Sequence, residues 1–379
     1  MRVLYIAPRY HTNQTAIVEG WLQHGDEVFF LSRKKATNED YSALTPDLIP
    51  YAKSFELFEK IYSFLCHSET AHDIGLKLGY PSARAIRKYI KNRHPDFVIL
   101  REKSVYSIVC YHILKRMGIK TIMYNQTPLY QEAPRYDRNL IHRIVDRLTP
   151  EFRFTPVRKI GDYAKAVIKD PHGIFVPFVM RLHCSPEEKH YFKDGTINVI
   201  DVGRFERRKN HHLLLQAFEK VYHEDHRVRL TIIGEIRRSQ YQTYYDEIIT
   251  FIREHFLTDV VTIKKNLRFE EMDAEYRAAD VFVIPSTGEP AAISPLEAMS
   301  YSVPAISSSG NGTADYIIDG VSGAIFKDKD MEDLTVKLRW IVRNAQQIPK
   351  MGQKAYENIA DNYQFANYYE ALMKWYVAG

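Results

Sequence analysis

The sequence predicts an α/β protein made of two doubly wound, Rossmann-like domains. Short apolar runs alternate with longer amphipathic stretches along the chain, a pattern typical of parallel strands covered by helices. The alternation continues to about residue 179 and starts afresh at residue 197. A chain of 379 residues is also long for one hydrophobic core and suits two.

The apolar runs place strands in both halves of the chain. In the first half we expect strands at 2–7, 27–32, 95–100, 119–124 and 173–179, with helices at 15–24 and 104–117. In the second half we expect strands at 197–204, 228–234, 260–266, 280–285, 303–307 and 323–326, with helices at 210–224, 239–256, 330–345 and 350–376. The segment 181–196, which contains Pro186 and Gly195, is the predicted linker.

The composition is that of an ordinary soluble globular protein, with 45% hydrophobic and 26% charged residues. No run of about 18 apolar residues predicts a transmembrane helix, and MRVLYIAPRY at the start predicts a buried strand, not a secretory signal. Cys66, Cys110 and Cys184 lack metal-type spacing. We expect them to be reduced thiols in a cytoplasmic protein.

Positive charge is concentrated in the first half of the chain. Residues 84–170 contain 19 Lys or Arg against 8 Asp or Glu, although the net charge of the whole chain is only +5. This excess favours an anionic partner: a phosphate-bearing substrate, an acidic membrane surface or a nucleic acid. A solvated basic helix surface explains it equally well.

The first motif with chemical content is VGRFERRKN at 202–210, where a predicted strand turns into a helix. Arg204 and Lys209 lie five positions apart in this turn. The amides and the dipole at the start of the helix already favour an anion there. Because a guanidinium can bind two oxygens and an ammonium acts as a point charge, the pair suits a diphosphate. A solvated basic turn is the alternative.

The second motif lies in 285–307, which leaves a predicted strand and enters a helix near Ser294, with Pro295 in its first turn. Glu289 in the loop and Glu297 in the helix can accept hydrogen bonds from sugar hydroxyls. The amides of Ile293 and Ser294 are predicted to bind phosphate oxygens. The alternative is that Glu297 only favours the helix dipole and that Glu289 is solvated.

A glycine-containing loop follows the next strand, at 307–326. Gly310 and Gly312 allow either a close backbone approach or a positive φ. A pair of glycines is a weak signal alone, and its position directly after the two glutamates is what makes it informative.

These three elements, in this order and spacing, resemble the donor-binding half of glycosyltransferase family 4, a retaining family of GT-B fold. The resemblance covers roughly residues 197–326. It implies that Arg204 and Lys209 hold the donor diphosphate, that Glu289 contacts the donor sugar and that Glu297 contacts the ribose. It places the nucleobase near 266–272, with Asn266 as a donor-binding residue.

The resemblance also implies the domain organisation. In a GT-B fold, two Rossmann-like domains face each other across a cleft, and the final helix crosses back to the N-terminal domain. We therefore expect an acceptor-binding domain over 1–180 together with a helix at about 360–379. The nucleotide-sugar-binding domain is expected over 181–359.

The N-terminal half resembles the family less closely. The loop after its first strand offers His11, Thr12, Asn13 and Gln14 as polar contacts, at a place where members of the family contact the donor phosphate or the acceptor. Where many members of the family have a histidine after the strand at 95–100, this chain has Arg101, which we count among the catalytic candidates. Asn125, Gln126 and Thr127 follow the next strand and are expected at the same edge of the sheet.

The resemblance implies transfer of a hexosyl or N-acetylhexosaminyl group to a saccharide or lipid-linked acceptor in surface polysaccharide or glycoconjugate synthesis. Arg204, Lys209, Glu289 and Arg101 are the catalytic candidates. We expect no metal, no other cofactor and no nucleic-acid partner, and a cytoplasmic location that allows peripheral association with the inner face of a membrane. The alternatives are a phosphorylase, an epimerase-type or non-catalytic sugar-nucleotide-binding protein and, from a different class, a basic nucleic-acid-binding protein.

Overall fold

The computed structural model describes residues 1–11, 14–35, 39–65, 78–101, 104–131, 147–161, 167–236 and 240–378. The chain divides into two compact units. Unit 1 comprises Met1–Thr155, Ile168–Val176 and Tyr369–Gly379, and unit 2 comprises Pro156–Val167 and Pro177–Tyr368. Neither unit is therefore one continuous stretch of sequence.

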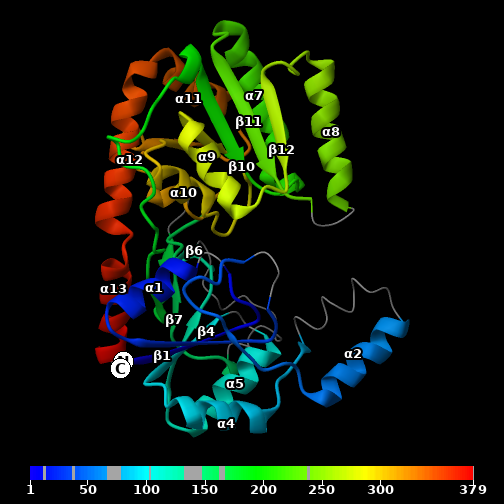
Figure 1. The fold of residues 1–379 in the computed structure, drawn as a ribbon, viewed down its shortest axis with the longest axis vertical. Helices are drawn as coiled ribbons and strands as arrows, with labels where there is room; N and C mark the ends of the chain where they lie inside the picture. The colour runs from blue at the N-terminus through cyan, green and yellow to red at the C-terminus, as the bar shows by residue number, and fades with distance from the viewer. Residues whose placement is uncertain are drawn as a thin grey trace. The chain divides into compact units, whose positions relative to one another are not determined.

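Unit 1 is built on a parallel sheet with the strand order β3-β2-β1-β4-β5-β7-β9 (Figure 1). Its strands are β1 (Arg2–Ala7), β2 (Glu27–Ser32), β3 (Asp47–Leu48), β4 (Phe97–Arg101), β5 (Lys120–Tyr124), β7 (Arg153–Thr155) and β9 (Gly173–Phe175). A short antiparallel pair, β6 (Tyr130–Gln131) and β8 (Ile168–Lys169), stands apart from it. The central strands β1 and β4 are almost entirely buried, as expected for a sheet covered on both faces.

The helices of unit 1 are α1 (Thr15–Gln23), α2 (Lys53–Leu65), α4 (Ala83–Arg93), α5 (Val105–Arg116) and the last part of α13 (Phe365–Ala378). One core joins α2, α4 and α5 to the sheet. On α13, Tyr369 packs against Trp21 with ring centroids 5.4 Å apart, and Trp375 packs against Phe97 at 6.4 Å. The end of the chain thereby completes the core of unit 1.

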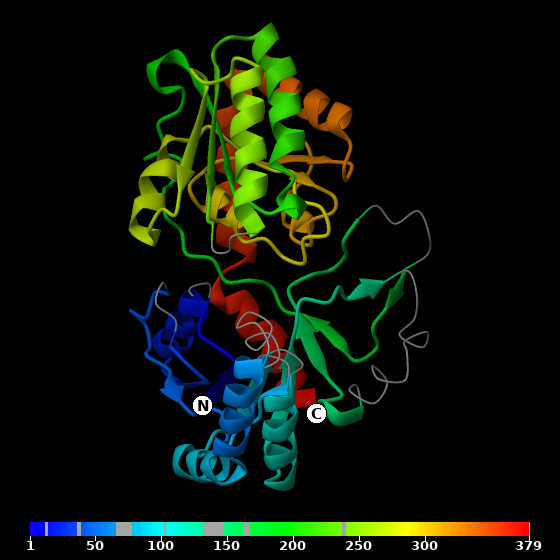
Figure 2. The same ribbon diagram turned by 90° about the vertical axis from the view of Figure 1, so that its right-hand side faces the viewer.

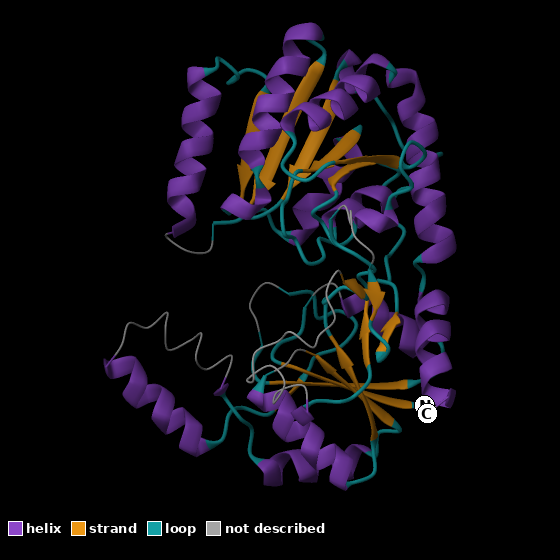
Figure 3. Cartoon of the chain, turned by 180° about the vertical axis from the view of Figure 1, so that it is seen from behind, coloured by secondary structure: helices purple, strands orange, loops and turns teal. Residues whose placement is uncertain are grey.

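Unit 2 contains a second parallel sheet, of order β12-β11-β10-β13-β14-β15. Figure 2 shows the helices at 211–224 and 240–254 side by side on one face of it. Its strands are β10 (Ile197–Val202), β11 (Val228–Gly234), β12 (Val261–Lys265), β13 (Val281–Ile284), β14 (Ala305–Ser308) and β15 (Gly323–Phe326). Its helices are α7 (His211–Glu224), α8 (Gln240–Glu254), α9 (Met272–Ala278), α10 (Ser294–Ser300), α11 (Met331–Arg343) and α12 (Ile348–Asn362). Figure 3 shows helices on both faces of this sheet, and α7, α8 and α11 share one core.

Both sheets reverse their strand order at one point, between β1 and β4 in unit 1 and between β10 and β13 in unit 2. In open parallel sheets, ligands bind outside the carboxyl ends of the strands at such a switch point. Each unit therefore has one edge at which a site is expected.

The structure divides one predicted helix into two and adds short strands that were not predicted, namely β3, β6, β7 and β8. The helix expected over 350–376 is broken between α12 and α13, where Gln364 turns its side-chain amide onto the carbonyl oxygens of Ile359 and Met180 at 3.0 and 3.2 Å. β7 has no predicted counterpart, because its first residue, Arg153, is charged and yet buried.

Cys110 and Cys184 are buried free thiols, whereas Cys66 lies outside the described residues. In the described ranges, no helix is both long and apolar enough to span a membrane. The same ranges contain no group of three or more His, Cys, Asp or Glu side chains arranged to hold a metal ion.

Candidate functional site

The turn after β10 is held in shape by a buried histidine. His211, the first residue of α7, places Nδ1 2.6 Å from Asp201 Oδ2 and Nε2 3.1 Å from the carbonyl oxygen of Arg204. The turn closes through a 3₁₀ segment, Arg207–Lys209, and through Asn210 in the left-handed region at φ 57°. This arrangement aims the side chain of Lys209 back over the end of the sheet.

Lys209 and Glu289 form a buried ion pair. Lys209 Nζ lies 2.6 Å from Glu289 Oε2, and the two residues are 9% and 6% exposed. Arg208 binds the same carboxylate oxygen. Burial alone opposes ionisation of Glu289, but Lys209 and Arg208 outweigh it, so the pKa of the carboxyl lies below its ordinary value.

Arg204 belongs to the same network through Glu206. Its Nε lies 2.7 Å from Glu206 Oε1, while Arg208 Nε donates to Glu206 Oε2 at 2.9 Å. The network thus joins three cations of this turn, Arg204, Arg208 and Lys209, to Glu206 and to Glu289 in the loop after β13. Net positive charge at the carboxyl ends of β10 and β13 is suited to an anionic ligand.

Glu297 lies in α10 and is half-buried. Burial raises the pKa of its carboxyl, and the Tyr276 hydroxyl, which donates to Oε2 at 2.8 Å, offsets only part of that rise. The amides of Ile293 and Ser294, which begin this helix, have no acceptor in the described part of the protein. The structure therefore places Glu297 one turn inside a helix whose first amides remain open to an oxygen ligand.

The loop after β14 packs directly on the loop that carries Glu289. The Glu289 amide donates to the carbonyl oxygen of Gly310 at 3.1 Å, and the Gly312 amide donates to that of Glu289 at 2.9 Å. A Cβ on Gly312 would lie 1.9 Å from the carbonyl oxygen of Pro290. The glycine is required by this close approach, because its φ is not positive.

Asn266 follows β12 in the left-handed region, at φ 54°. Its amide donates to the carbonyl oxygen of Gly234, and its Oδ1 accepts from the Ile236 amide at 3.1 Å. The side chain therefore joins the loops after β11 and β12. Its predicted role in donor binding remains a proposal.

In unit 1, Arg101 ends β4 and stacks on Tyr124 at the end of β5, with 5.4 Å from its guanidinium carbon to the ring centroid. Asn125 follows β5, and its Oδ1 accepts from the guanidinium of Arg153 at 3.1 Å. Arg153 in turn donates Nε to Asp170 Oδ2 at 2.6 Å, and both residues are buried. A buried ion pair thus supports the loop that begins at Asn125.

The other candidates of unit 1 also follow β1 and β5. Gln14 accepts from the His11 amide through Oε1 at 3.3 Å, and His11 Nε2 accepts from Arg9 Nε at 3.1 Å. Gln126 donates to the Tyr124 hydroxyl at 3.4 Å. Thr12 and Asn13 lie outside the described residues.

Sequence reasoning missed Arg208 and Tyr276. Arg208 is the third cation of VGRFERRKN, and only the 3₁₀ turn decides that it and Lys209 both face Glu289. Tyr276 is 21 positions from Glu297, and no local pattern links the two residues.

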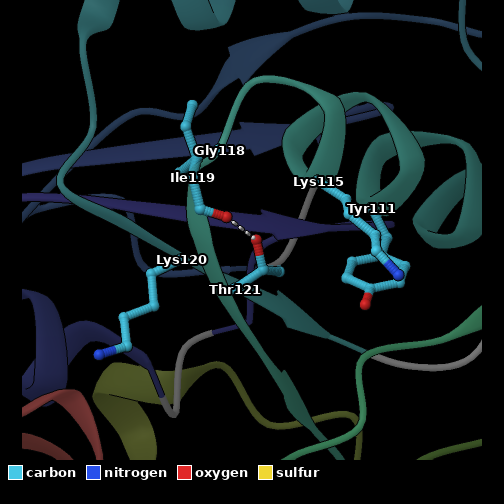
Figure 4. A pocket seen from close by; sticks show the side chains of 6 residues that line it. All are labelled: Tyr111, Lys115, Gly118, Ile119, Lys120 and Thr121. Atoms are coloured by element: carbon cyan, nitrogen blue, oxygen red, sulfur yellow. Dashed lines mark hydrogen bonds between the residues drawn. The ribbon is translucent and has the colours of Figure 1, made fainter. Parts of the chain in front are cut away.

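Two pockets lie away from these residues. One, of about 390 Å³, is lined by residues of α5 and by Gly118–Thr121 at the amino end of β5 (Figure 4). The other, of about 480 Å³, lies between α7 and α8 beside His212 and Phe251. The first is at the opposite edge of the sheet from Arg101 and Asn125. The candidate site is therefore the group of charged residues around Lys209 and Glu289, at the carboxyl ends of β10 and β13.

Solved structures show which class of fold this is. A glycosyltransferase from Rickettsia africae matches with a TM-score of 0.71 and 13% identity, covering 99% of this chain and 97% of that chain. Anabaena HepE in complex with UDP-glucose matches with a TM-score of 0.69 and 10% identity over 100% of both chains. The protein therefore has the GT-B fold.

The family model matches a segment that lies within unit 2. Residues 186–358, just under half of the chain, match the family described as glycosyl transferases group 1. A D-inositol 3-phosphate glycosyltransferase of Pseudarthrobacter chlorophenolicus is 26% identical over 52% of this chain and 48% of its own length.

The capsular polysaccharide biosynthesis glycosyltransferase CapM of Staphylococcus aureus is 24% identical over 88% of this chain and 82% of its own. The first curated relatives are matched over only 29%, 48% and 44% of their own length, so the chain spans about half of them or less.

Proposed function

We propose that this protein is a retaining glycosyltransferase of the family 4 type. It transfers a hexosyl or N-acetylhexosaminyl group from a nucleoside-diphosphate sugar to a saccharide or lipid-linked acceptor, in the synthesis of a surface polysaccharide or glycoconjugate. The observation that carries the proposal is the Lys209–Glu289 pair, with Arg208 beside it, at the switch point of unit 2. The family match over 186–358 and the name of CapM point to the same activity.

In this proposal the cations of the turn stabilise the leaving group. When the glycosidic bond to the donor breaks, negative charge grows on the diphosphate, and preorganised cations lower the energy of that state. Arg204 and Lys209 hold the diphosphate, Arg208 adds a third cation, and the amides of Ile293 and Ser294 bind its oxygens. No metal is needed for this role.

Glu289 positions the sugar and does not attack it. The acceptor hydroxyl attacks on the face from which the diphosphate departs, and the leaving phosphate takes its proton. This differs from retaining glycosidases, in which a carboxylate forms a covalent intermediate. Glu297 binds the ribose and Asn266 lies beside the base. In unit 1, His11, Gln14, Arg101, Asn125 and Gln126 form the acceptor side.

The test is a thermal-shift series with UDP, GDP, ADP, TDP and CMP, because a ligand that binds only the folded state raises the melting temperature. We expect one nucleoside diphosphate to give a shift that Arg204→Ala and Glu297→Ala abolish. Arg207→Ala is the matched control, because Arg207 is exposed in the same turn and pairs with Glu247. No shift, together with salt-sensitive binding of DNA or RNA, would instead favour the nucleic-acid alternative.

The stereochemistry is tested on the product. With the donor identified, NMR of the transferred sugar is expected to give the anomeric configuration of the donor. An inverted product would overturn the retaining assignment and leave the donor site intact. Binding without transfer to any acceptor would favour a non-catalytic sugar-nucleotide-binding protein.

A further inference from the structure

Lys189 is a buried cation to which the mechanism above gives no role. It lies in the segment 181–196, the predicted linker, and only 6% of it is exposed. Its Nζ donates to the carbonyl oxygens of Tyr276, Arg277 and Ala279 at 3.0, 2.7 and 2.6 Å. An ammonium group has three donors, so these three hydrogen bonds satisfy it.

The three carbonyl oxygens belong to the end of α9. This helix has only seven residues, and the last carbonyl oxygens of a helix have no partner within it. A cation at that end satisfies them and interacts favourably with the helix dipole. Lys189 therefore fixes the end of α9, and with it Tyr276, which lies in the last turn of the helix.

Tyr276 transmits this constraint to Glu297. It is 3% exposed, and its hydroxyl donates to Glu297 Oε2 at 2.8 Å, from α9 to α10 (Figure 1). Its ring stacks on that of Tyr301, with the centroids 5.2 Å apart and the planes at 22°. The Tyr301 hydroxyl in turn donates to Asp273 Oδ1 at 2.9 Å, which ties that ring back to α9.

This arrangement leaves one oxygen of Glu297 for a ligand. In the part of the chain that the structure describes, Oε2 accepts from Tyr276 and no group donates to Oε1. A carboxylate that is already anchored through Oε2 presents Oε1 in one direction. It therefore loses less side-chain entropy when a ligand binds. Because the Tyr276 hydroxyl is buried and bound to Glu297, Tyr276 acts through that carboxylate.

We propose that Tyr276 and Lys189 are positioning residues that make the site selective for ribose over deoxyribose. Tyr276 holds the Glu297 carboxylate toward the ribose hydroxyls, and Lys189 holds Tyr276 through the end of α9. The inference rests on the ribose contact of the proposed function. An ionised carboxylate can only accept hydrogen bonds, so a carboxylate fixed in this way distinguishes a sugar with a hydroxyl donor from one without it.

The experiment is calorimetric titration of the full chain with UDP, 2′-deoxy-UDP and 3′-deoxy-UDP, or with the matching three nucleotides if the thermal-shift series selects another base. The measured quantity is the ratio of the affinity for the ribonucleotide to that for the weaker deoxy form. We expect a ratio on the order of 10–100 in the unchanged protein, the effect of a hydrogen bond to a charged group. In Tyr276→Phe we expect the ratio to fall about fivefold.

Tyr301→Phe is the matched control, because it removes a buried hydroxyl of the same cluster that binds Asp273 and keeps the stacked ring. We expect it to leave the ratio unchanged. Lys189→Met should lower the ratio as Tyr276→Phe does. The two changes together should lower it no further than the larger single effect, because both act through Glu297. Melting temperatures report which variants are folded.

The outcomes separate this proposal from the proposed function. If no nucleoside diphosphate binds the unchanged protein, the proposed function fails and this proposal fails with it. If Glu297→Ala lowers the ratio and Tyr276→Phe does not, the ribose contact stands and the positioning role is overturned. An equal fall in Tyr301→Phe would also overturn it, because any disturbance of the cluster would then have the same effect.

Discussion

Lys209→Met tests the buried pair with Glu289 directly. Methionine keeps most of the length of the side chain and removes its charge, so the carboxylate, 6% exposed, loses its buried partner. Removal of one member of a buried ion pair costs about 3–5 kcal/mol of unfolding free energy. Because Arg208 remains bound to Glu289, we expect the lower end of that range, about 3 kcal/mol.

The pH dependence has a defined sign. The pKa of Glu289 lies below its ordinary value of 4.5, so the pair contributes stability above pH 4.5 and loses it as pH falls through the native pKa. The difference between the unchanged protein and Lys209→Met should therefore shrink in acid.

The assay is hydrogen exchange of peptides covering β10 and β13 across a urea series, which isolates unit 2 in a chain of two units. Combining Lys209→Met with Glu289→Gln removes the buried carboxylate that has lost its lysine and should recover stability to within about 1 kcal/mol of the unchanged protein. The reasoning is refuted if Lys209→Met is as stable as the unchanged protein at neutral pH, or if the double variant is no better than the single one.

Three further predictions follow from the site and its supports. The native pKa of Glu297 is raised above 4.5, so the unchanged protein loses unfolding free energy as pH rises from 4.5 through that native pKa. Glu297→Gln has no charge to form there, and urea titrations should therefore show its stability rising relative to that of the unchanged protein toward neutral pH. The same variant should bind nucleoside diphosphate more weakly in calorimetry; equal affinity would argue against a ribose contact. Asp170→Asn leaves the buried Arg153 without its carboxylate and should cost unit 1 about 3–5 kcal/mol, seen as faster exchange of β7 and β9 amides; unchanged exchange would contradict it. Gly312→Ala places a Cβ 1.9 Å from the Pro290 carbonyl oxygen and should lower the unfolding free energy by about 1–3 kcal/mol. It should also abolish the nucleotide-dependent thermal shift, whereas an unaltered melting curve would count against this packing.

Most of the two sheets was predictable because their strands are apolar runs that local sequence reveals. β1 and β2 have the expected bounds, and β10 and β13 differ from the prediction only at their ends. β7 escaped because Arg153 is a charged residue inside a sheet, which only the distant Asp170 makes tolerable. The burial of Arg153 depends on a tertiary contact, and no pattern in the neighbouring sequence predicts it.

The site was predictable as a set of residues and not as a network. The spacing of Arg204, Lys209, Glu289 and Glu297 identified candidates whose ligand contacts remain to be tested. The pairing of Arg204 with Glu206, and of Arg208 with Glu289, depends on how a 3₁₀ turn rotates successive side chains. Such a turn has no periodicity that a sequence pattern can report.

Unit 1 is assembled from stretches that lie before and after unit 2 in the sequence, and this has a consequence for its folding during translation. Trp21 and Phe97 acquire their partners on α13 only after all of unit 2 has been translated. At about 5–20 residues per second, the stretch from Pro177 to Tyr368 delays that event by roughly 10–40 s. During this interval the core of the nascent first unit lacks the rings of Tyr369 and Trp375, so Trp21 and Phe97 are left partly uncovered. A chaperone that recognises exposed aromatic side chains would find its binding site there.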